Sequence, residues 1–111
     1  MIAPLRAPYP YFGGKRRAAT LIWQGIGDVD HYIEPFCGSA AVLLARPHVP
    51  RCETINDLDG MVSNFWRAIR ADPDAVAHHV DWPVLEPDLH ARHLWLIGQR
   101  ESLTERLIND P

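Results

Sequence analysis

The feature that most restricts the fold is the order in which two short strand-like segments and several helix-like segments follow one another. Residues 31–34 and 52–56 are predicted to be strands, and each is followed by a turn and then by a helical segment. Strands that alternate with helices favour parallel pairing. The sequence therefore predicts an α/β fold, although two strands are too few for a complete sheet of that class.

Helices are predicted where apolar residues recur at helical spacing and where prolines mark the ends. The predicted helices are 15–25, 39–46, 59–71, 73–80 and 88–108. On the first helix the expected apolar face is Ala18, Leu21, Ile22 and Gly25. On the third it is Met61, Val62, Phe65, Trp66 and Ile69, and on the last it is Leu89, His93, Leu96, Ile97, Leu103 and Leu107. Trp23, Trp66 and Trp95 are expected to be buried in the core.

Composition narrows the class of protein. The chain has 111 residues, of which 47% are hydrophobic and 23% charged, close to the values of ordinary globular proteins. We expect one partial domain over residues 1–111, with 81–111 as the helical start of a following region. The apolar runs are far shorter than the roughly 20 residues of a membrane helix. The expected compartment is therefore the cytoplasm, with no membrane partner.

The charges are distributed unevenly along the chain. The first 27 residues contain four basic side chains and no acidic one, which suits either a phosphate or carboxylate ligand or a solvated surface. Cys37 and Cys52 form no CxxC pair and are expected to be small buried thiols. The histidines lack the further ligands that a zinc site needs, so no metal is expected.

The turn after the first predicted strand is the best candidate for a ligand site. Gly38, Ser39 and Ala40 are small, so a ligand could approach the backbone where the next helix begins. Asp57 ends the next strand, 19 residues after Gly38, where nucleotide-binding α/β folds hold the ribose hydroxyls. The pattern suggests an adenosine-bearing cofactor, and the alternative is a tight turn with an acid that caps a helix.

Three segments resemble, in order and spacing, successive motifs of the Dam-type DNA adenine N6-methyltransferases. They are Pro10-Tyr11-Phe12-Gly13-Gly14-Lys15, Glu34-Pro35-Phe36-Cys37-Gly38-Ser39 and Asn56-Asp57-Leu58-Asp59. The resemblance covers about residues 8–75. It implies a Rossmann-like methyltransferase fold, incomplete in this chain, with S-adenosylmethionine as the cofactor and DNA as the substrate.

The resemblance also implies roles for individual residues. The cofactor-binding residues that it implies are Tyr11, Lys15, Glu34, Pro35, Phe36, Gly38, Ser39 and Asp57. Tyr11 and Lys15 would lie beside the cofactor, with Lys15 facing its carboxylate, and Asp57 would bind the ribose. Gly38 and Ser39 would lie under the methionine moiety, Glu34 and Pro35 would shape the turn, and Phe36 would pack rather than contact the ligand.

One position departs from the family pattern. Ala40 stands where the family often has glycine. The extra methyl group would either narrow the turn or be harmless, because alanine favours the start of a helix.

The chain also differs from the family beyond these three motifs. Family members complete methyl transfer with an Asp-Pro-Pro-Tyr type motif, which holds the flipped adenine. No such motif occurs in these residues. Asp110–Pro111 has the first two residues of the motif but is not interpreted as its start, so no catalytic residue is assigned. We expect an N-terminal fragment that is inactive and marginally stable alone and that contacts DNA only through the missing part.

Two alternatives stay open. One is a non-catalytic S-adenosylmethionine- or nucleotide-binding module that works with a complementing C-terminal chain. The other is an unrelated α/β protein that uses NAD or ATP, although the glycine patterns of those sites are absent.

Overall fold

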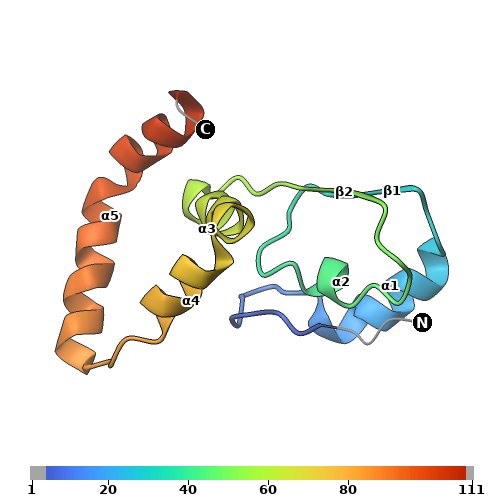
Figure 1. The fold of residues 1–111 in the computed structure, drawn as a ribbon, viewed down its shortest axis with the longest axis horizontal. Coiled ribbons are helices and arrows are strands. Elements are labelled where there is room, and N and C mark those ends of the chain that lie inside the picture. Colours follow the sequence, from blue (N-terminus) through green and yellow to red (C-terminus); the bar gives the residue numbers. More distant parts are fainter. Residues whose placement is uncertain (1–4, 110–111) are drawn as a thin grey trace. The chain divides into compact units, whose positions relative to one another are not determined.

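The computed structural model describes residues 5–109 and divides the chain into two compact units, Met1–Leu58 and Asp59–Pro111 (Figure 1). The first unit contains the strands and the second is helical. Asp110–Pro111, the pair set aside as the start of a catalytic motif, lies outside the described residues. None of the described helices combines the length and the apolar character that a membrane-spanning helix needs.

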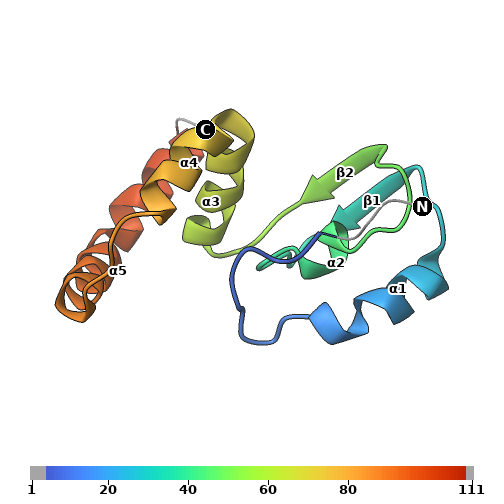
Figure 2. The same cartoon turned by 60° about the horizontal axis from the view of Figure 1, so that its bottom comes forward.

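The first unit is built on two parallel strands, as the sequence predicts. Strand β1 (His31–Glu34) pairs with β2 (Cys52–Ile55), with His31 opposite Cys52 and Glu34 opposite Ile55. Helices α1 (Ala19–Ile26) and α2 (Ala41–Leu44) lie on one side of this sheet (Figure 2). A short 3-10 helix, η1 (Arg16–Ala18), leads into α1.

The core of the first unit forms around Trp23. Its indole Nε1 donates a hydrogen bond to the Val42 carbonyl at 2.7 Å, and its ring lies 4.6 Å from that of Tyr32 between centroids. The predicted face of this helix is right only for Ile22, which packs against the core, because Leu21 is 72% exposed whereas Ala19 is buried with Trp23. The burial of the large indole, which needs a partner for its N–H, sets the rotation of α1.

Helix α2 is shorter than the predicted 39–46. It begins only at Ala41 because Ala40 has a φ of 53°, in the left-handed region. The chain turns away soon after Leu44, and Pro47 cannot donate the backbone hydrogen bond that a continued helix requires.

A buried arginine connects the loop before β1 to strand β2. Arg46 is 4% exposed and donates to the Glu53 carboxylate at 3.0 Å and to the Val29 carbonyl at 2.6 Å. The neighbouring Arg51 is exposed and pairs with Asp28 at 3.2 Å. The two cysteines are both free, but only Cys37 is buried, so the expectation for Cys52 is wrong.

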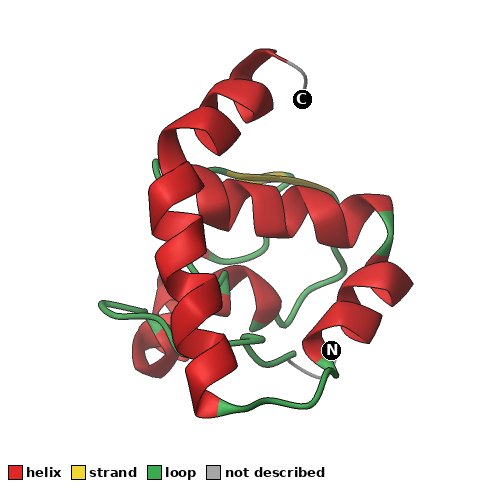
Figure 3. Ribbon diagram, turned by 90° about the vertical axis from the view of Figure 1, so that its left-hand side faces the viewer, coloured by secondary structure: helices red, strands yellow, loops and turns green. Residues whose placement is uncertain are grey.

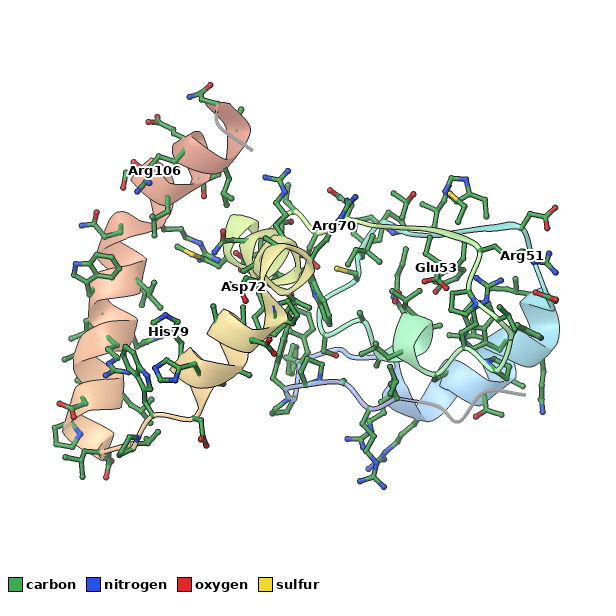
Figure 4. The ribbon with its side chains drawn as sticks, viewed as in Figure 1. Arg51, Glu53, Arg70, Asp72, His79 and Arg106 are labelled. Carbon is green, nitrogen blue, oxygen red and sulfur yellow. The ribbon has the colours of Figure 1, made fainter. Side chains whose placement is uncertain are left out.

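The second unit consists of α3 (Gly60–Ala71), α4 (Pro73–Val80) and α5 (Glu86–Asn109), shown as helices in Figure 3. Aspartates cap the first two. The Asp59 carboxylate accepts a hydrogen bond from the Met61 N–H at 2.9 Å. The carboxylate of Asp72, which is labelled in Figure 4, accepts one from the Ala75 N–H at 3.0 Å.

The predicted apolar face of α3 is confirmed, since its members are half-buried. Of the face predicted for α5, Leu103 and Leu107 are half-buried and the other members are exposed. The core role predicted for Trp95 is wrong, because its side chain is 61% exposed. No residue that the structure describes in this unit is fully buried. Thr104 and Leu107 of α5 lie against Gly60 at the start of α3, and the Leu107 carbonyl accepts a hydrogen bond from Arg67 at 3.1 Å.

Candidate functional site

The candidate site is the turn that connects β1 to α2. Gly38 and Ala40 both have positive φ, 50° and 53°, so the backbone reverses tightly after the strand. The Ala40 N–H closes the turn by donating to the Cys37 carbonyl at 2.7 Å. Because α2 has only four residues, the turn itself, rather than the end of a long helix, determines the chemistry here.

The end of β2 is tied to this turn. The Cys37 N–H donates to the Asn56 carbonyl at 2.9 Å, and the Asn56 side-chain amide donates to the Pro35 carbonyl at 3.1 Å. The Gly38 N–H donates to the Asp57 carboxylate at 2.9 Å. Parallel strands end at the same edge of a sheet, so the acid after β2 lies beside the turn after β1, as its position in the sequence suggests.

Glu34, the last residue of β1, holds a buried carboxylate at the same edge. It is 6% exposed, and its Oε2 atom has no hydrogen-bond partner. Burial raises the pKa of the Glu34 carboxyl, against the opposing effects of the Lys15 charge and of hydrogen bonds from the Leu43 backbone and the Tyr32 hydroxyl. A buried acceptor without a donor is costly unless a ligand supplies one.

The neighbouring groups respond to the same environment. Burial and the negative charge of Glu34 raise the pKa of the Tyr32 phenol to about 12. Burial, with the charge of Asp57 next, raises the pKa of the Cys37 thiol to about 11. Cys37 is therefore a protonated thiol at neutral pH and not an activated nucleophile.

A segment from the N-terminal part of the chain covers the turn. Its residues Tyr11 and Lys15 line a small pocket together with Glu34, Phe36 and Ser39. The volume of this pocket is about 30 Å³, whereas sites for drug-sized molecules enclose roughly 300 Å³ or more. The pocket brings the Lys15 ammonium and the Glu34 carboxylate to one place, but its space in this conformation holds no more than one or two waters.

The structure brings together the residues that the sequence singles out. Tyr11, Lys15, Glu34, Phe36 and Ser39 line the pocket, while Gly38 and Asp57 bond to each other beside it. Pro35 is exposed and contributes its carbonyl to the turn. Phe36 is 74% exposed, so it does not pack as expected.

One residue at the site was missed by sequence reasoning. The Tyr9 hydroxyl donates to the Gly38 carbonyl at 2.9 Å. Its only sequence signal is its place next to the motif that begins at Pro10, two residues before Tyr11. Among the described residues no cluster of three or more histidine, cysteine or acidic side chains could hold a metal ion.

Comparison with known families decides the class of protein. The family described as D12 class N6 adenine-specific DNA methyltransferase matches residues 11–86. The chain belongs to this family. The match includes both strands, the turn and Asp57, and it confirms the family resemblance seen in the sequence. No curated protein and no solved structure matches the chain.

Membership of the family has consequences for fold and cofactor. The family implies the fold of S-adenosylmethionine-dependent methyltransferases. The described part of this chain has mixed helices and strands, with two strands paired in parallel. It also implies S-adenosylmethionine as the cofactor and DNA as the substrate class of the family.

Proposed function

We propose that the edge of the sheet formed by Glu34, Gly38 and Asp57, with Lys15 beside it, is the S-adenosylmethionine site of an adenine N6 DNA methyltransferase. The observation that carries this proposal is the buried Oε2 of Glu34, which has no hydrogen-bond partner. An ammonium group would supply the missing donor. The methionine part of the cofactor carries one, together with a carboxylate that suits Lys15.

Asp57 supplies the second part of the proposed site. One of its oxygens, Oδ2, accepts the hydrogen bond from the Gly38 N–H. A carboxylate has about four acceptor positions, enough to receive the two hydroxyls of a ribose beside this backbone donor. Glu34 and Asp57 therefore recognise the two ends of one molecule, with the Gly38 turn between them.

The bound cofactor supplies an electrophilic methyl group on its sulfonium. The residues of this chain hold and orient the molecule that carries it, which is a positional contribution to catalysis. The 111 residues contain no Asp-Pro-Pro-Tyr type motif to hold the adenine amine. We therefore propose that these 111 residues bind the cofactor and do not by themselves methylate DNA.

Titration calorimetry of S-adenosylmethionine into the whole chain tests the proposal. Asp57→Ala should weaken binding at least tenfold, because the variant lacks the carboxylate that binds the ribose. The expected loss of binding free energy is on the order of that of one hydrogen bond to a charged group. Asp30→Ala is the matched control, since this acid is exposed and precedes β1 at the other end of the strand. A folded chain that binds no cofactor, or binds it equally in both variants, would contradict the site.

A methyl-transfer assay on adenine-containing DNA tests the second part. The purified chain should bind S-adenosylmethionine without labelling the DNA. Robust methylation by the chain alone would show that residues within these 111 supply the catalytic step.

A further inference from the structure

The segment from Tyr9 to Gly14, named the strap here, lies directly on the turn that the proposed function assigns to the cofactor. A Cβ atom built on Gly38 would lie only 2.5 Å from Cδ1 of Tyr11. The Tyr11 ring therefore packs closely against a glycine that offers no side chain. This contact covers the face of the turn where Gly38 leaves its backbone bare.

The strap is held down by a specific hydrogen bond. The Tyr9 hydroxyl donates to the Gly38 carbonyl at 2.9 Å across 29 residues of sequence. The Tyr9 and Tyr11 rings meet edge to face, 6.3 Å apart between centroids. Because the two rings contact each other, release of the Tyr9 hydroxyl would loosen the Tyr11 ring as well.

The strap also has a place to bend. Gly13 has a φ of 75°, and nothing lies within 4 Å of the position that its Cβ would take. The Gly14 N–H closes a turn by donating to the Tyr11 carbonyl at 3.0 Å. A glycine in open space can change its backbone angles without a clash, so the strap can swing about residues 13–14 while Lys15 stays near Glu34.

We propose that the strap closes the cofactor site and must lift for the cofactor to enter, with the Tyr9 hydroxyl holding it shut. This inference rests on the proposed function. The pocket of about 30 Å³ under the strap has room for only one or two waters, whereas a methyltransferase cofactor is many times larger. The closed strap thus lowers the apparent affinity, because only the fraction of molecules with a lifted strap can bind.

Nuclear magnetic resonance on the unaltered chain tests the movement. In the free protein, an NOE should connect the Tyr11 ring to the Gly38 Hα, and it should vanish when S-adenosylhomocysteine is added to saturation. The Trp23–Tyr32 contact in the core is the internal control and should persist, since those rings lie 4.6 Å apart. An NOE from Tyr11 to Gly38 that survives saturation would overturn the proposal.

The variant Tyr9→Phe tests how the strap is held. Loss of one neutral hydrogen bond from the closed form should raise the affinity for S-adenosylhomocysteine about fivefold and speed its association. Thr54→Val is the matched control, because it removes a hydroxyl that bonds to His31 at 2.9 Å in the same unit, outside the strap. Unchanged or weaker binding by Tyr9→Phe would overturn the role of this hydroxyl.

The two proposals fail in different ways. If the chain binds no cofactor at all, the proposed function fails. The strap is then still tested in the free protein, where Tyr9→Phe should speed hydrogen exchange of the Gly14 amide and leave the amides of β1 unchanged. Equal exchange of Gly14 in the two proteins would overturn the holding role without any ligand.

Discussion

Ala40 is a strained residue at the centre of the candidate site. It is fully buried and has a φ of 53° and a ψ of 33°, a conformation that costs a residue with a Cβ about 1–2 kcal/mol. The interpretation that alanine is harmless here because it favours a helix start is wrong, since Ala40 is not in a right-handed helical conformation. Glycine, which the family often has at this position, would adopt the same turn without strain.

Replacement of Ala40 by glycine should therefore stabilise the protein. We expect Ala40→Gly to raise the free energy of unfolding by about 1 kcal/mol, measured by urea denaturation. The matched control is Ala41→Gly, one residue later and inside α2, which should lower it by about 0.5–1 kcal/mol. Destabilisation by both variants would show that the Ala40 methyl contributes more through packing than it costs in strain.

Glu34 should make stability depend on pH. Burial raises the pKa of its carboxyl above the ordinary value of 4.5, so the folded state holds this proton more tightly than the unfolded state. Its favourable contribution is complete below about 4.5 and is lost as the pH rises through the raised value. Glu34→Gln should therefore gain stability relative to the unaltered chain between about pH 4 and pH 7.

Urea denaturation at several pH values checks this prediction. The difference in unfolding free energy between Glu34→Gln and the unaltered chain should grow as the pH rises. Asp57→Asn, which alters a half-buried carboxylate, serves as the control in the same site. The same Glu34→Gln protein should bind S-adenosylmethionine at least tenfold more weakly, so the gain in stability and the loss of binding separate the two roles of this carboxylate.

At the scale of elements, the two arginines that flank the loop between α2 and β2 should contribute differently to stability. Arg46 and Arg51 both pair with Asp28, but the Arg46 side chain is 3% exposed and that of Arg51 is 48% exposed. Arg46 also joins the Val29 carbonyl to Glu53 of β2 and lies over the Trp23 ring, 5.2 Å from its centroid. Figure 4 shows Glu53 on the side of the sheet where α2 lies.

We expect Arg46→Met to lower the free energy of unfolding by about 2 kcal/mol, because it removes the buried guanidinium that donates to Glu53 and to the Val29 carbonyl. Arg51→Met should change it by less than about 1 kcal/mol, as is usual for exposed ion pairs. Thermal and urea denaturation of the two variants side by side measure the difference. Equal effects would mean that the burial of Arg46 has no energetic consequence.

Helix α3 depends on its first capping residue. Asp59 accepts the Met61 N–H and also pairs with Arg100 of α5, and loss of an aspartate cap costs about 1 kcal/mol. Asp59→Ala should therefore lower the helical circular-dichroism signal and the urea midpoint. Arg100→Ala removes only the exposed ion pair and should cost less, so a larger loss from Arg100→Ala would contradict the cap as the main contribution.

At the scale of the whole molecule, the two units differ in how much they bury. The first has a core of Ala19, Trp23, Tyr32 and Val42, whereas no described residue of the second is fully buried. A helical unit whose side chains are at most half-buried gains less from the hydrophobic effect, which supplies most of the stability of packed helices.

The second unit should therefore open at lower denaturant than the first. Native-state hydrogen exchange should show the amides of α3, α4 and α5 exchanging before those of β1 and α1. A single cooperative transition, with equal protection in both units, would show that their stabilities are linked.

Much of the local structure could be predicted from sequence. The parallel pairing, the strand His31–Glu34, the helix Pro73–Val80 and the half-buried face of α3 follow from short-range pattern and are confirmed. The rotation of α1, the length of α2 and the exposure of Trp95 do not. The rotation of α1 depends on the partner that the Trp23 indole finds in α2, and the length of α2 depends on the left-handed backbone at Ala40. Spacing along the chain specifies neither.

The sequence by itself determined the family, the order of strands and helices, and the residues that gather at the edge of the sheet, because these depend on residue type and spacing. Only the tertiary structure decided that Glu34 keeps a buried oxygen without a donor, that Ala40 is left-handed, and that the Tyr9 hydroxyl bonds to Gly38. The physical reason is that burial, backbone strain and hydrogen bonds between distant residues arise only when the chain is packed.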